Sequence, residues 1–349
     1  MSKDITLGIF GSGQLGTELV KSAKKLGLKT IVFSNDKHGP AQKFSDSYIF
    51  SDYNDVSNLE KFINSIDVCT YEFENIPLET INKVNEIKKV HPNPNCLRIT
   101  QNRILEKSFA NELGIKSTEW KHIKSLEELK KSTNLFPGIL KTCTMGYDGK
   151  GQFRINSLND IDENLDFSKE YILEKLVDLK KEISVAATRY QDGKISIYEP
   201  SENKHENGIL RHSKIPANIN QNLFKKSQEI TKLICEKLDY VGTLCVEFLI
   251  TKSNELLYNE QSCRPHNSYW NTVNSHSVSQ FMGHIKSTCG LDFVNNKKIS
   301  NSEMYNILGF EILEYRKKTF KKNEFFHDYL KKEPREGRKM GHLTILKKD

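Results

Sequence analysis

The sequence predicts a chain of mixed α/β and α+β class, arranged in three parts. Alternating strand and helix patterns come first, longer apolar runs with hairpin turns follow, and a short basic segment closes the chain. The 349 residues leave room for two or three domains, since a domain usually takes ~100 to 200 residues. We therefore expect domains over residues 1–95, 96–295 and 296–349.

The first part has the pattern of a β-α-β unit. "ITLGIF" (5–10) and "KTIVFSND" (29–36) are β-rich runs, and "TELVKSAKKLGL" (17–28) between them has helical spacing. A third run, "IDVCTYEFENIP" (66–77), follows a helical stretch from Val56 to Ile63, and "KVHPNP" (89–94) ends this part with two prolines. This leaves room for about four strands, whereas a complete Rossmann domain needs six.

Gly11, Gly13 and Gly16 form a GxGxxG loop between the first strand and the first helix, and Asp36 follows farther along the chain. Glycines allow close backbone approach to a ligand, and a helix N-terminus attracts phosphate. Three interpretations stay open: a tight strand-to-helix turn, a phosphate- or substrate-facing loop in a truncated Rossmann-like domain, and a NAD site.

The second part changes character. "NRILEKSFANELGI" (102–115) predicts an amphipathic helix that ends at Gly114. Sheet is predicted for "YILEKLV" (171–177) and for two hairpins with turns at "QDGK" and "KSNE". "HLTILK" (342–347) predicts a closing strand, in a C-terminal segment too small to be stable without docking on the rest.

Composition limits the class of protein. The net charge of +7 is concentrated in "RKKTFKK" (316–322) and "KKEPREGRK" (331–339), which are either solvated surface or a site for an anionic group such as a phosphate or nucleic acid. The seven scattered cysteines favour reduced thiols in the cytoplasm. We expect neither a signal peptide nor a membrane span, because no apolar run approaches the ~18 residues that a span needs.

The second hairpin places two glutamates opposite each other. With a two-residue turn at Ser253 and Asn254, antiparallel pairing brings Glu247 directly across from Glu260. Like charges in this position are destabilising, so we expect a cation between them. Carboxylate oxygens suit Mg²⁺, completed by nucleotide phosphates and water; the alternative is that both side chains point into solvent.

Polar donors crowd the segment that follows Glu260. The string "QSCRPHNS" carries Arg264, His266, Asn267 and Ser268, and guanidinium and amide groups can hold a carboxylate or phosphate. The alternative is a loop whose histidine caps a helix.

These pieces together resemble one family. "GSGQLG", "TYEFENIP", "NRILEK", "ILKTCTMGYDGKGQ", "EISV", "ENKHENGILRHS", "VGTLCVEF", "NEQSCRPHNS" and "GRKMGH" have the order and spacing of the N5-carboxyaminoimidazole ribonucleotide synthetases, from residue 5 to residue 346. The resemblance implies an ATP-grasp architecture with a Rossmann-like N-terminal domain, a central ATP-grasp domain and a small C-terminal domain. It also implies a cytoplasmic homodimer with small-molecule substrates and without nucleic acid or membrane as a partner.

The implied reaction couples ATP, bicarbonate and 5-aminoimidazole ribonucleotide to give the N5-carboxylated ribonucleotide, ADP and phosphate, through carboxyphosphate. Positioning and exclusion of water would matter more than a protein nucleophile. The implied metal is Mg²⁺, with Mn²⁺ as a possible substitute, held by Glu247 and Glu260.

The resemblance also implies site residues. The catalytic residues would be Lys150, Arg264, His266, Asn267 and Glu72. ATP would be bound by Arg103, Lys141, the glycine-rich loop Gly146, Tyr147, Asp148, Gly149, Lys150, Gly151 and Gln152, the adenine linker Glu174, Lys175, Leu176 and Val177, and by Glu182, His205, Asn259 and Glu260. The ribonucleotide and bicarbonate would contact Glu72, Tyr147, Lys150, His266, Asn267 and Ser268, and the 5'-phosphate would contact Lys332, Arg338 and Lys339.

One departure from the family pattern concerns the donor-rich loop. Members usually read RPHNSGHW, whereas this chain has "RPHNSYWN", so Tyr269 replaces a glycine and Trp270 and Asn271 replace His-Trp. A bulky Tyr269 is expected to shift this loop. Two alternatives are kept: another ATP-grasp ligase, such as a formate-dependent glycinamide ribonucleotide transformylase or a biotin carboxylase, and a catalytically weakened nucleotide-binding protein.

Overall fold

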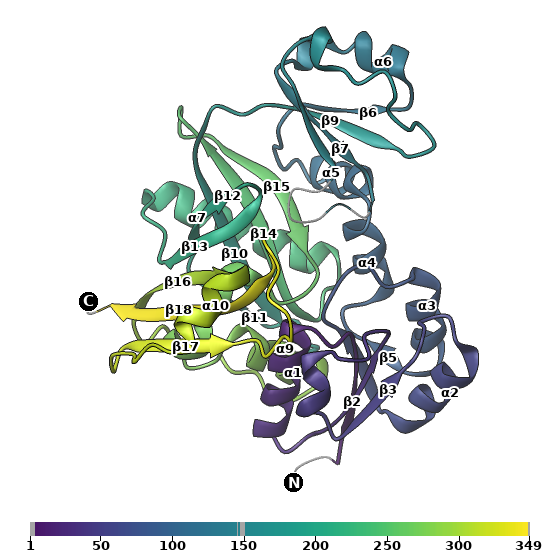
Figure 1. The fold of residues 1–349 in the computed structure, drawn as a ribbon, viewed down its shortest axis with the longest axis vertical. Helices are drawn as coiled ribbons and strands as arrows, with labels where there is room; N and C mark the ends of the chain where they lie inside the picture. The colour runs from purple at the N-terminus through teal and green to yellow at the C-terminus, as the bar shows by residue number, and fades with distance from the viewer. Residues whose placement is uncertain (1–3, 145, 147–150, 348–349) are drawn as a thin grey trace.

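The computed structural model describes residues 4–144, 146 and 151–347. It contains three sheets, each with its own position in the molecule (Figure 1). The glycine-rich loop residues Tyr147, Asp148, Gly149 and Lys150 lie outside the described residues. Within the described ranges, no helix is both long and apolar enough to cross a membrane.

The N-terminal sheet is parallel and has the order β3-β2-β1-β4-β5. Its strands are β1 (Thr6–Phe10), β2 (Lys29–Ser34), β3 (Ser47–Phe50), β4 (Val68–Tyr71) and β5 (Lys89–Val90), and its helices are α1 (Gln14–Lys25), α2 (Val56–Ser65) and α3 (Leu78–Ile87). The described residues thus form five strands here, against the four expected. The sequence named the runs that hold β1, β2 and β4, and the two strands that it did not name are β3, which follows a polar stretch, and β5, which has only two residues.

Two helices lead from this sheet to the second one. Asn93 caps α4 (Pro94–Thr100) and Asn102 caps α5 (Arg103–Glu112), each by accepting backbone N–H bonds. The expected boundary at residue 95 therefore falls in the first turn of α4. Gly114, with a φ of +71°, ends the α5 region as predicted.

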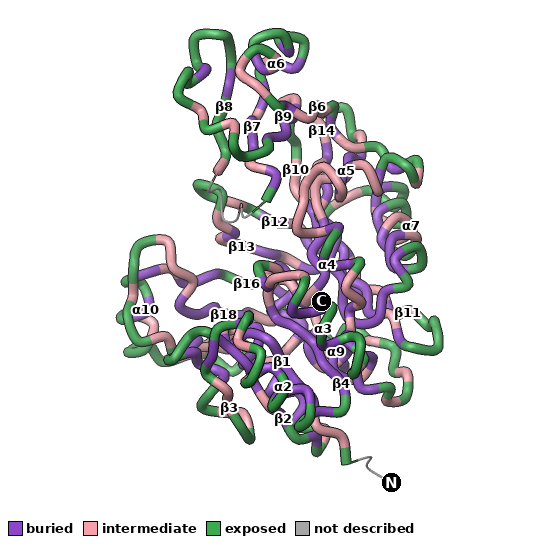
Figure 2. Tube along the Cα trace, turned by 90° about the vertical axis from the view of Figure 1, so that its right-hand side faces the viewer, coloured by how far each residue is buried: buried purple, intermediate pink, exposed green. Residues whose placement is uncertain are grey.

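The second sheet is antiparallel, in the order β6-β9-β7-β8, and lies at the top of Figure 1. It consists of β6 (Trp120–Ile123), β7 (Gly138–Thr142), β8 (Gln152–Ile155) and β9 (Tyr171–Lys175), with α6 (Leu126–Lys130). A separate small apolar core supports it, built around Leu140, Leu173 and Ile123. Its outer tip is mostly exposed, whereas buried residues run through the strands of the other two sheets (Figure 2).

The third sheet is antiparallel and joins the second and third parts of the chain. Its order is β15-β14-β10-β12-β13-β16-β18-β17, with β11 beside β10. The strands are β10 (Leu179–Arg189), β11 (Ile195–Ile197), β12 (Ser201–Glu206), β13 (Ile209–Ile215), β14 (Gly242–Thr251), β15 (Leu256–Ser262), β16 (Asn301–Leu308), β17 (Glu324–Asp328) and β18 (Lys339–Lys347). Helices α7 (Gln221–Lys237), α8 (Thr272–Ser275), α9 (Gln280–Thr288) and α10 (Ile312–Tyr315) accompany them. Because β16 pairs with β13, the small C-terminal segment docks by extending this sheet.

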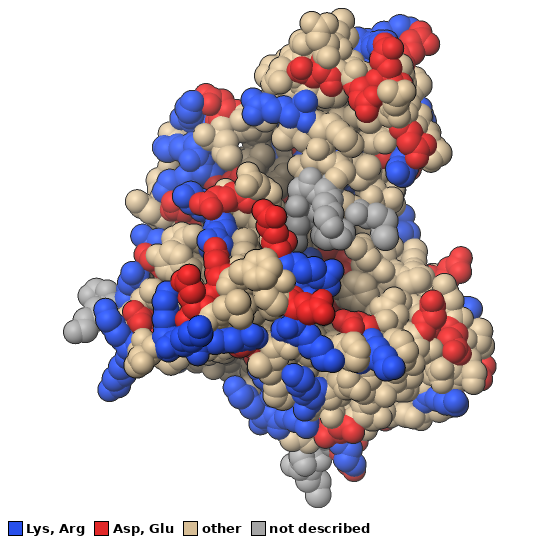
Figure 3. Space-filling model, in the orientation of Figure 1, with Lys and Arg blue, Asp and Glu red and all other residues tan. Residues whose placement is uncertain are grey.

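One apolar core joins the first and third sheets. Phe10, Phe33 and Phe62 pack together at ring-centre distances of 4.9–5.4 Å, and they belong to the same buried cluster as Val246 and Tyr258 of β14 and β15. This shared core fixes the N-terminal sheet against the hairpin that carries the paired glutamates. Residues 316–322, by contrast, are mostly exposed, and Lys and Arg side chains gather over the C-terminal strands at the lower left of Figure 3.

Candidate active site

A cleft of about 410 Å³ lies where the three parts of the chain meet. Eleven of the predicted site residues line it: Glu72, Arg103, Gly146, Gln152, His205, Glu247, Glu260, Arg264, His266, Asn267 and Lys339. Residues distant in sequence are thus brought to one cavity, and most of them are charged or polar.

The two glutamates pair across strands as predicted, but the two-residue turn from which we predicted this pairing is wrong. Glu247 on β14 lies opposite Glu260 on β15. The turn has three residues, because Thr251 N–H donates to the carbonyl of Glu255 and Asn254 has a φ of +62°. A β-bulge between Phe248 and Glu247, which leaves Asn259 unpaired with β14, restores the register.

Glu260 is held by a cation from the chain itself. Arg103 Nη1 lies 2.8 Å from Glu260 Oε2. The backbone places this arginine, because the Asn102 cap starts α5 at Arg103 and Arg103 N–H donates to the carbonyl of Cys143 at the end of β7. Burial alone would raise the pKa of Glu260, but Arg103 and Lys141 lower it to about 2. Glu260 is therefore ionised at neutral pH.

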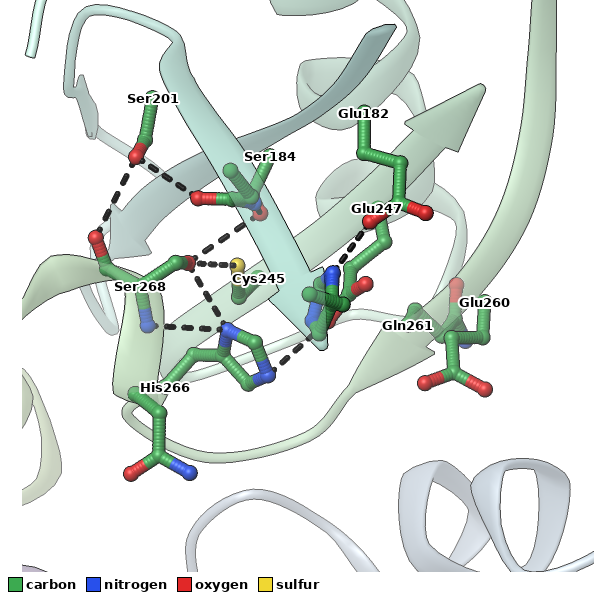
Figure 4. Close-up of polar contacts among 12 residues, drawn as sticks. Glu182, Ser184, Ser201, Cys245, Glu247, Glu260, Gln261, His266 and Ser268 are labelled. Atoms are coloured by element: carbon green, nitrogen blue, oxygen red, sulfur yellow. Dashed lines mark hydrogen bonds and ion pairs between the residues drawn. The ribbon is translucent and has the colours of Figure 1, made fainter. Parts of the chain in front are cut away.

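Glu247 is paired with His266. The imidazole Nε2 lies 3.0 Å from Glu247 Oε1, and Nδ1 lies 2.9 Å from the Ser268 hydroxyl. Burial would lower the pKa of His266, but the Cys245 sulfur and the Glu247 carboxylate raise it to about 10. Figure 4 shows the ring held between Ser268 on one side and the carboxylate on the other.

Ser268 does not line the cleft, in contrast to its predicted role as a substrate contact. It is fully buried, and its hydroxyl donates to that of Ser184 at 3.1 Å. Asn203 donates in turn to Ser184, and Ser213 donates to the Ser268 carbonyl at 2.6 Å. Ser268 therefore lies behind His266, within a buried polar network that holds the ring in place (Figure 4).

Arg264 and Asn267 lie on the same loop. Arg264 Nη2 is 3.5 Å from Glu74 Oε2, and Glu74 also accepts the backbone N–H of Cys263 at 3.0 Å. Asn267 Oδ1 accepts from Trp270 Nε1 at 3.1 Å. This loop is therefore tied to the N-terminal domain through Glu74, a residue that the sequence did not single out.

Tyr269 is a core residue and does not face the cleft. Its side chain is fully buried, and its hydroxyl lies 2.8 Å from the carbonyl of Ser184 and 2.9 Å from that of Glu199. The Tyr269 side chain thus occupies a pocket in the third sheet, beside Tyr198.

The GxGxxG loop binds a carboxylate from the protein. Glu72, at the end of β4, accepts N–H bonds from Gly13 at 2.5 Å and Gly16 at 2.9 Å. A Cβ atom on Gly11 would lie 2.5 Å from Glu72 Cγ, and one on Gly13 would lie 2.7 Å from Glu72 Oε1. These glycines therefore make room for Glu72, which takes the amide groups that a dinucleotide pyrophosphate would need. Burial raises the pKa of Glu72, while the two amides lower it.

The predicted adenine linker begins with a buried ion pair. Lys141 Nζ lies 2.9 Å from Glu174 Oε2, so the Glu174 carboxylate is engaged with a lysine that is itself predicted to bind ATP. Lys175 pairs with Glu119 at 3.0 Å, and Leu176 N–H donates to the carbonyl of Pro137 at 2.8 Å. Val177, the last linker residue, is half-buried. Glu182, predicted to bind ATP, pairs with His205.

The basic segment at the C-terminus brings the predicted Lys339 to the cleft, and Lys331 contacts it. Lys332 is exposed, and Arg338 Nη1 donates to the carbonyl of Glu333. Lys331 Nζ, which the prediction passed over, donates to the carbonyl of Lys339 at 2.8 Å, and its charge opposes the rise in the pKa of Glu72 that burial causes. Leu330, with a φ of +56°, turns the chain just before it.

Several lining residues were missed by the sequence prediction. They are Gln14, Leu15, Phe73, Glu74, Asn75, Thr100, Gln101, Glu106, Cys143, Gly208, Leu210, Gln261 and Ser262. Glu106 could have been found, because its spacing of three from Arg103 puts both on one face of α5. Its carboxylate accepts the N–H of Gln261 at 2.7 Å, and burial, with Glu260 nearby, raises its pKa to about 8.

Three family models match the chain, one for each part. Residues 4–101 match a ribonucleotide synthetase preATP-grasp domain, residues 108–281 an ATP-grasp domain, and residues 302–349 a phosphoribosylaminoimidazole carboxylase C-terminal domain.

Curated relatives are similar over nearly the whole length. The N5-carboxyaminoimidazole ribonucleotide synthase of Brucella melitensis is 37% identical over 348 residues, which cover 98% of this chain and 96% of the relative. The synthase of Bacillus subtilis is 35% identical over 357 residues, which cover 99% of this chain and 94% of the relative.

Solved structures of such synthetases are similar to this chain over nearly its whole length. An ADP complex of an N5-carboxyaminoimidazole ribonucleotide synthetase has a TM-score of 0.94 at 35% identity and covers 99% of this chain and 93% of its own. The Aspergillus clavatus synthase in complex with ADP and 5-aminoimidazole ribonucleotide has a TM-score of 0.92 at 26% identity, with coverages of 99% and 95%.

Proposed function

This chain belongs to the N5-carboxyaminoimidazole ribonucleotide synthase family of ATP-grasp enzymes, and from this premise we propose how its cleft performs the family's reaction. The chain is an ATP-dependent ligase of purine biosynthesis that carboxylates 5-aminoimidazole ribonucleotide to N5-carboxyaminoimidazole ribonucleotide. The observation that carries the assignment of roles is the Glu247–Glu260 pair, in which each carboxylate is held by its own cation on the wall of the cleft.

The chemistry activates bicarbonate, which is a poor electrophile. A bicarbonate oxygen attacks the γ-phosphorus of ATP and ADP leaves. The resulting carboxyphosphate gives its carboxyl group to the amine nitrogen of the ribonucleotide, which loses a proton, while phosphate departs. The protein's task is to position the reactants and exclude water, because water would hydrolyse the intermediate.

Glu247 and Glu260 would hold Mg²⁺ or Mn²⁺. They fit this role because two carboxylates on neighbouring strands face one cavity and Glu260 is ionised. Among the described residues, no group of three or more His, Cys, Asp or Glu side chains forms a complete metal site, so phosphate oxygens and water would complete the shell. When bound, the ion would neutralise charge on the phosphates.

Arg103 and Lys141 would bind the phosphates as well, since both reach the Glu260 side of the cleft. We assign the adenine to the linker from Glu174 to Val177 through backbone groups, because the Glu174 side chain is occupied by Lys141. Glu182, His205 and Asn259 are proposed as further nucleotide contacts. Gly146, Tyr147, Asp148, Gly149, Lys150, Gly151 and Gln152 are proposed as the loop that closes over the phosphates.

Arg264 and His266 would bind bicarbonate and stabilise the charge of carboxyphosphate, because both present partly buried cationic donors on one loop. The ribonucleotide amine would meet Glu72, whose oxygens keep second lone pairs free of the loop amides. Asn267 would contact the same substrate. Lys332, Arg338 and Lys339 are proposed for the 5'-phosphate, and the structure favours adding Lys331 to them.

We also propose a cytoplasmic homodimer. All seven cysteines are free and buried, which is typical of a reducing compartment. Sedimentation velocity tests the dimer, and a single monomeric species over the micromolar range would contradict it.

Phosphate release tests the assigned reaction. We expect release from ATP that requires Mg²⁺ and rises only when bicarbonate and 5-aminoimidazole ribonucleotide are both present. Equal release with glycinamide ribonucleotide and formate instead would assign the cleft to a different ligase.

A further inference from the structure

A lysine without an assigned role lies buried beside the proposed phosphate-binding lysine. Lys107 is on α5, one turn after Arg103, and its relative exposure is 1%. Its ammonium lies 3.6 Å from Glu174 Oε2 and 5.7 Å from the centre of the Tyr258 ring. Burying an isolated ammonium group is costly, so the carboxylate that Lys107 faces is its main compensation.

The same carboxylate oxygen also faces Lys141. Lys141 Nζ lies 2.9 Å from Glu174 Oε2, and Glu174 is as buried as the two lysines. Burial would raise the pKa of Glu174, but the charges of Lys107 and Lys141 lower it below its ordinary value. One ionised carboxylate is therefore shared by two ammonium groups, of which Lys141 holds the shorter contact.

We propose that Lys107 is a positioning residue, which keeps Glu174 paired when Lys141 turns to the nucleotide phosphates. This inference rests on the proposed role of Lys141. To reach a phosphate, Lys141 must loosen its contact with Glu174. Without Lys107 that step would leave a buried carboxylate with no partner, which is strongly unfavourable.

The distances make this exchange easy. A charged hydrogen bond is about 2.8 Å long, so Lys107 needs to approach Glu174 by less than ~1 Å from its present 3.6 Å. Lys107 Nζ and Glu174 Oε1 are also buried atoms without a hydrogen-bond partner among the described residues. The cluster thus holds unused hydrogen-bonding capacity on both sides of the pair that would form.

Calorimetric titration of the full-length protein with ADP and Mg²⁺ tests the proposal. Lys107→Met should raise the Kd for ADP by about tenfold or more, because Lys141 stays on Glu174. The KM for ATP should rise in parallel, with kcat within about threefold of the unaltered protein. Lys107→Arg should restore most of the affinity, and adding Glu174→Gln to Lys107→Met should restore it by releasing Lys141. Lys116→Met, which removes an exposed lysine paired with Glu255, is the matched control and should change the Kd less than about twofold.

Lys141→Met separates this proposal from the function on which it rests. If Lys141→Met weakens ADP binding and Lys107→Met does not, the proposal is overturned while the role of Lys141 stands. If Lys141→Met leaves ADP binding unchanged, the phosphate-binding role itself fails. Should Lys107→Met not fold, the Lys107→Met, Glu174→Gln double variant still decides, because it leaves no unpaired buried carboxylate; binding weaker by more than about tenfold in that variant would also overturn the proposal.

Discussion

Replacing Glu72 with glutamine removes one of the two acceptors that hold the glycine loop at the start of α1. Both carboxylate oxygens accept backbone N–H groups, from Gly13 and Gly16. Glutamine has nearly the same shape, but it offers one oxygen and one NH₂ group. One of the two loop amides would then face a donor and lose its bond.

The size of the effect follows from these contacts. An unsatisfied buried N–H group costs about 1–3 kcal/mol, and the loss of a carboxylate at a helix N-terminus costs about 0.3–1 kcal/mol. The sum of about 1.3–4 kcal/mol corresponds to a Tm lower by roughly 2–5 °C for a chain of this size. Because Glu72 is also proposed to meet the ribonucleotide amine, the KM for the ribonucleotide should rise as well.

Differential scanning calorimetry without ligands measures the Tm, and Glu79→Gln, an exposed glutamate in the first turn of α3, is the control. The control should stay within about 1 °C of the unaltered protein. An unchanged Tm for Glu72→Gln would refute the reasoning that the loop amides depend on this carboxylate, whatever happens to the turnover.

Other predictions concern the cleft, the core and pH. Glu260→Gln should lower turnover about 100-fold or more through lost metal binding; steady-state rates near normal across a Mg²⁺ titration would remove Glu260 from the metal site. Tyr269→Phe should destabilise the protein by about 1–2 kcal/mol through its lost hydroxyl bonds and leave turnover nearly unchanged, so a large loss of activity with unaltered stability in urea titrations would place Tyr269 in the site. Burial lowers the pKa of His284 to about 3, so the unfolded chain binds a proton that the folded chain does not, and stability is lost as pH falls below 6.5. Between pH 7.5 and 5.5 this loss is about 1.4 kcal/mol, and His284→Gln should make urea unfolding less dependent on pH over that range; an equal dependence would argue against a neutral buried His284.

The paired glutamates show how much of a hairpin could be predicted from strand patterns. The alternation of apolar and polar residues predicted the hairpin, and the pairing of Glu247 with Glu260 is confirmed. The path to it contained two errors that offset each other, a turn one residue too short and an unrecognised bulge at Asn259. A bulge depends on the packing of both strands, so it could not be predicted from the local sequence.

Roles that depend on which way a side chain points were harder to predict. Ser268 belongs to the donor-rich loop, yet its hydroxyl lies behind His266 because buried groups on β10 and β13 accept and donate around it. Tyr269 was expected to shift the donor-rich loop. The pocket that holds its side chain could not be foreseen, because strands far away in sequence form it. The sequence left the role of the glycine loop open between a tight turn, a phosphate- or substrate-facing loop and a NAD site, because only the parallel pairing of β1 with β4 brings Glu72 to it.

The fold class could be predicted from the sequence because the periodic patterns are long. The family could be predicted because several motifs follow one order along the chain. Short strands could not be predicted: β5 has two residues, which are too few to show the alternation of a strand. The buried lysine at position 107 gave no signal either, since its spacing on an amphipathic helix is equally compatible with an exposed face.

Transfer of oxygen from bicarbonate to phosphate tests the central claim most directly. The proposed reaction makes a bond between a bicarbonate oxygen and the γ-phosphorus of ATP, and that oxygen stays with phosphorus when carboxyphosphate breaks down. With ¹⁸O-labelled bicarbonate, ATP, Mg²⁺ and 5-aminoimidazole ribonucleotide, mass spectrometry should find one ¹⁸O atom in the released phosphate for each carboxylated product. Carboxylated product accompanied by unlabelled phosphate would contradict the account.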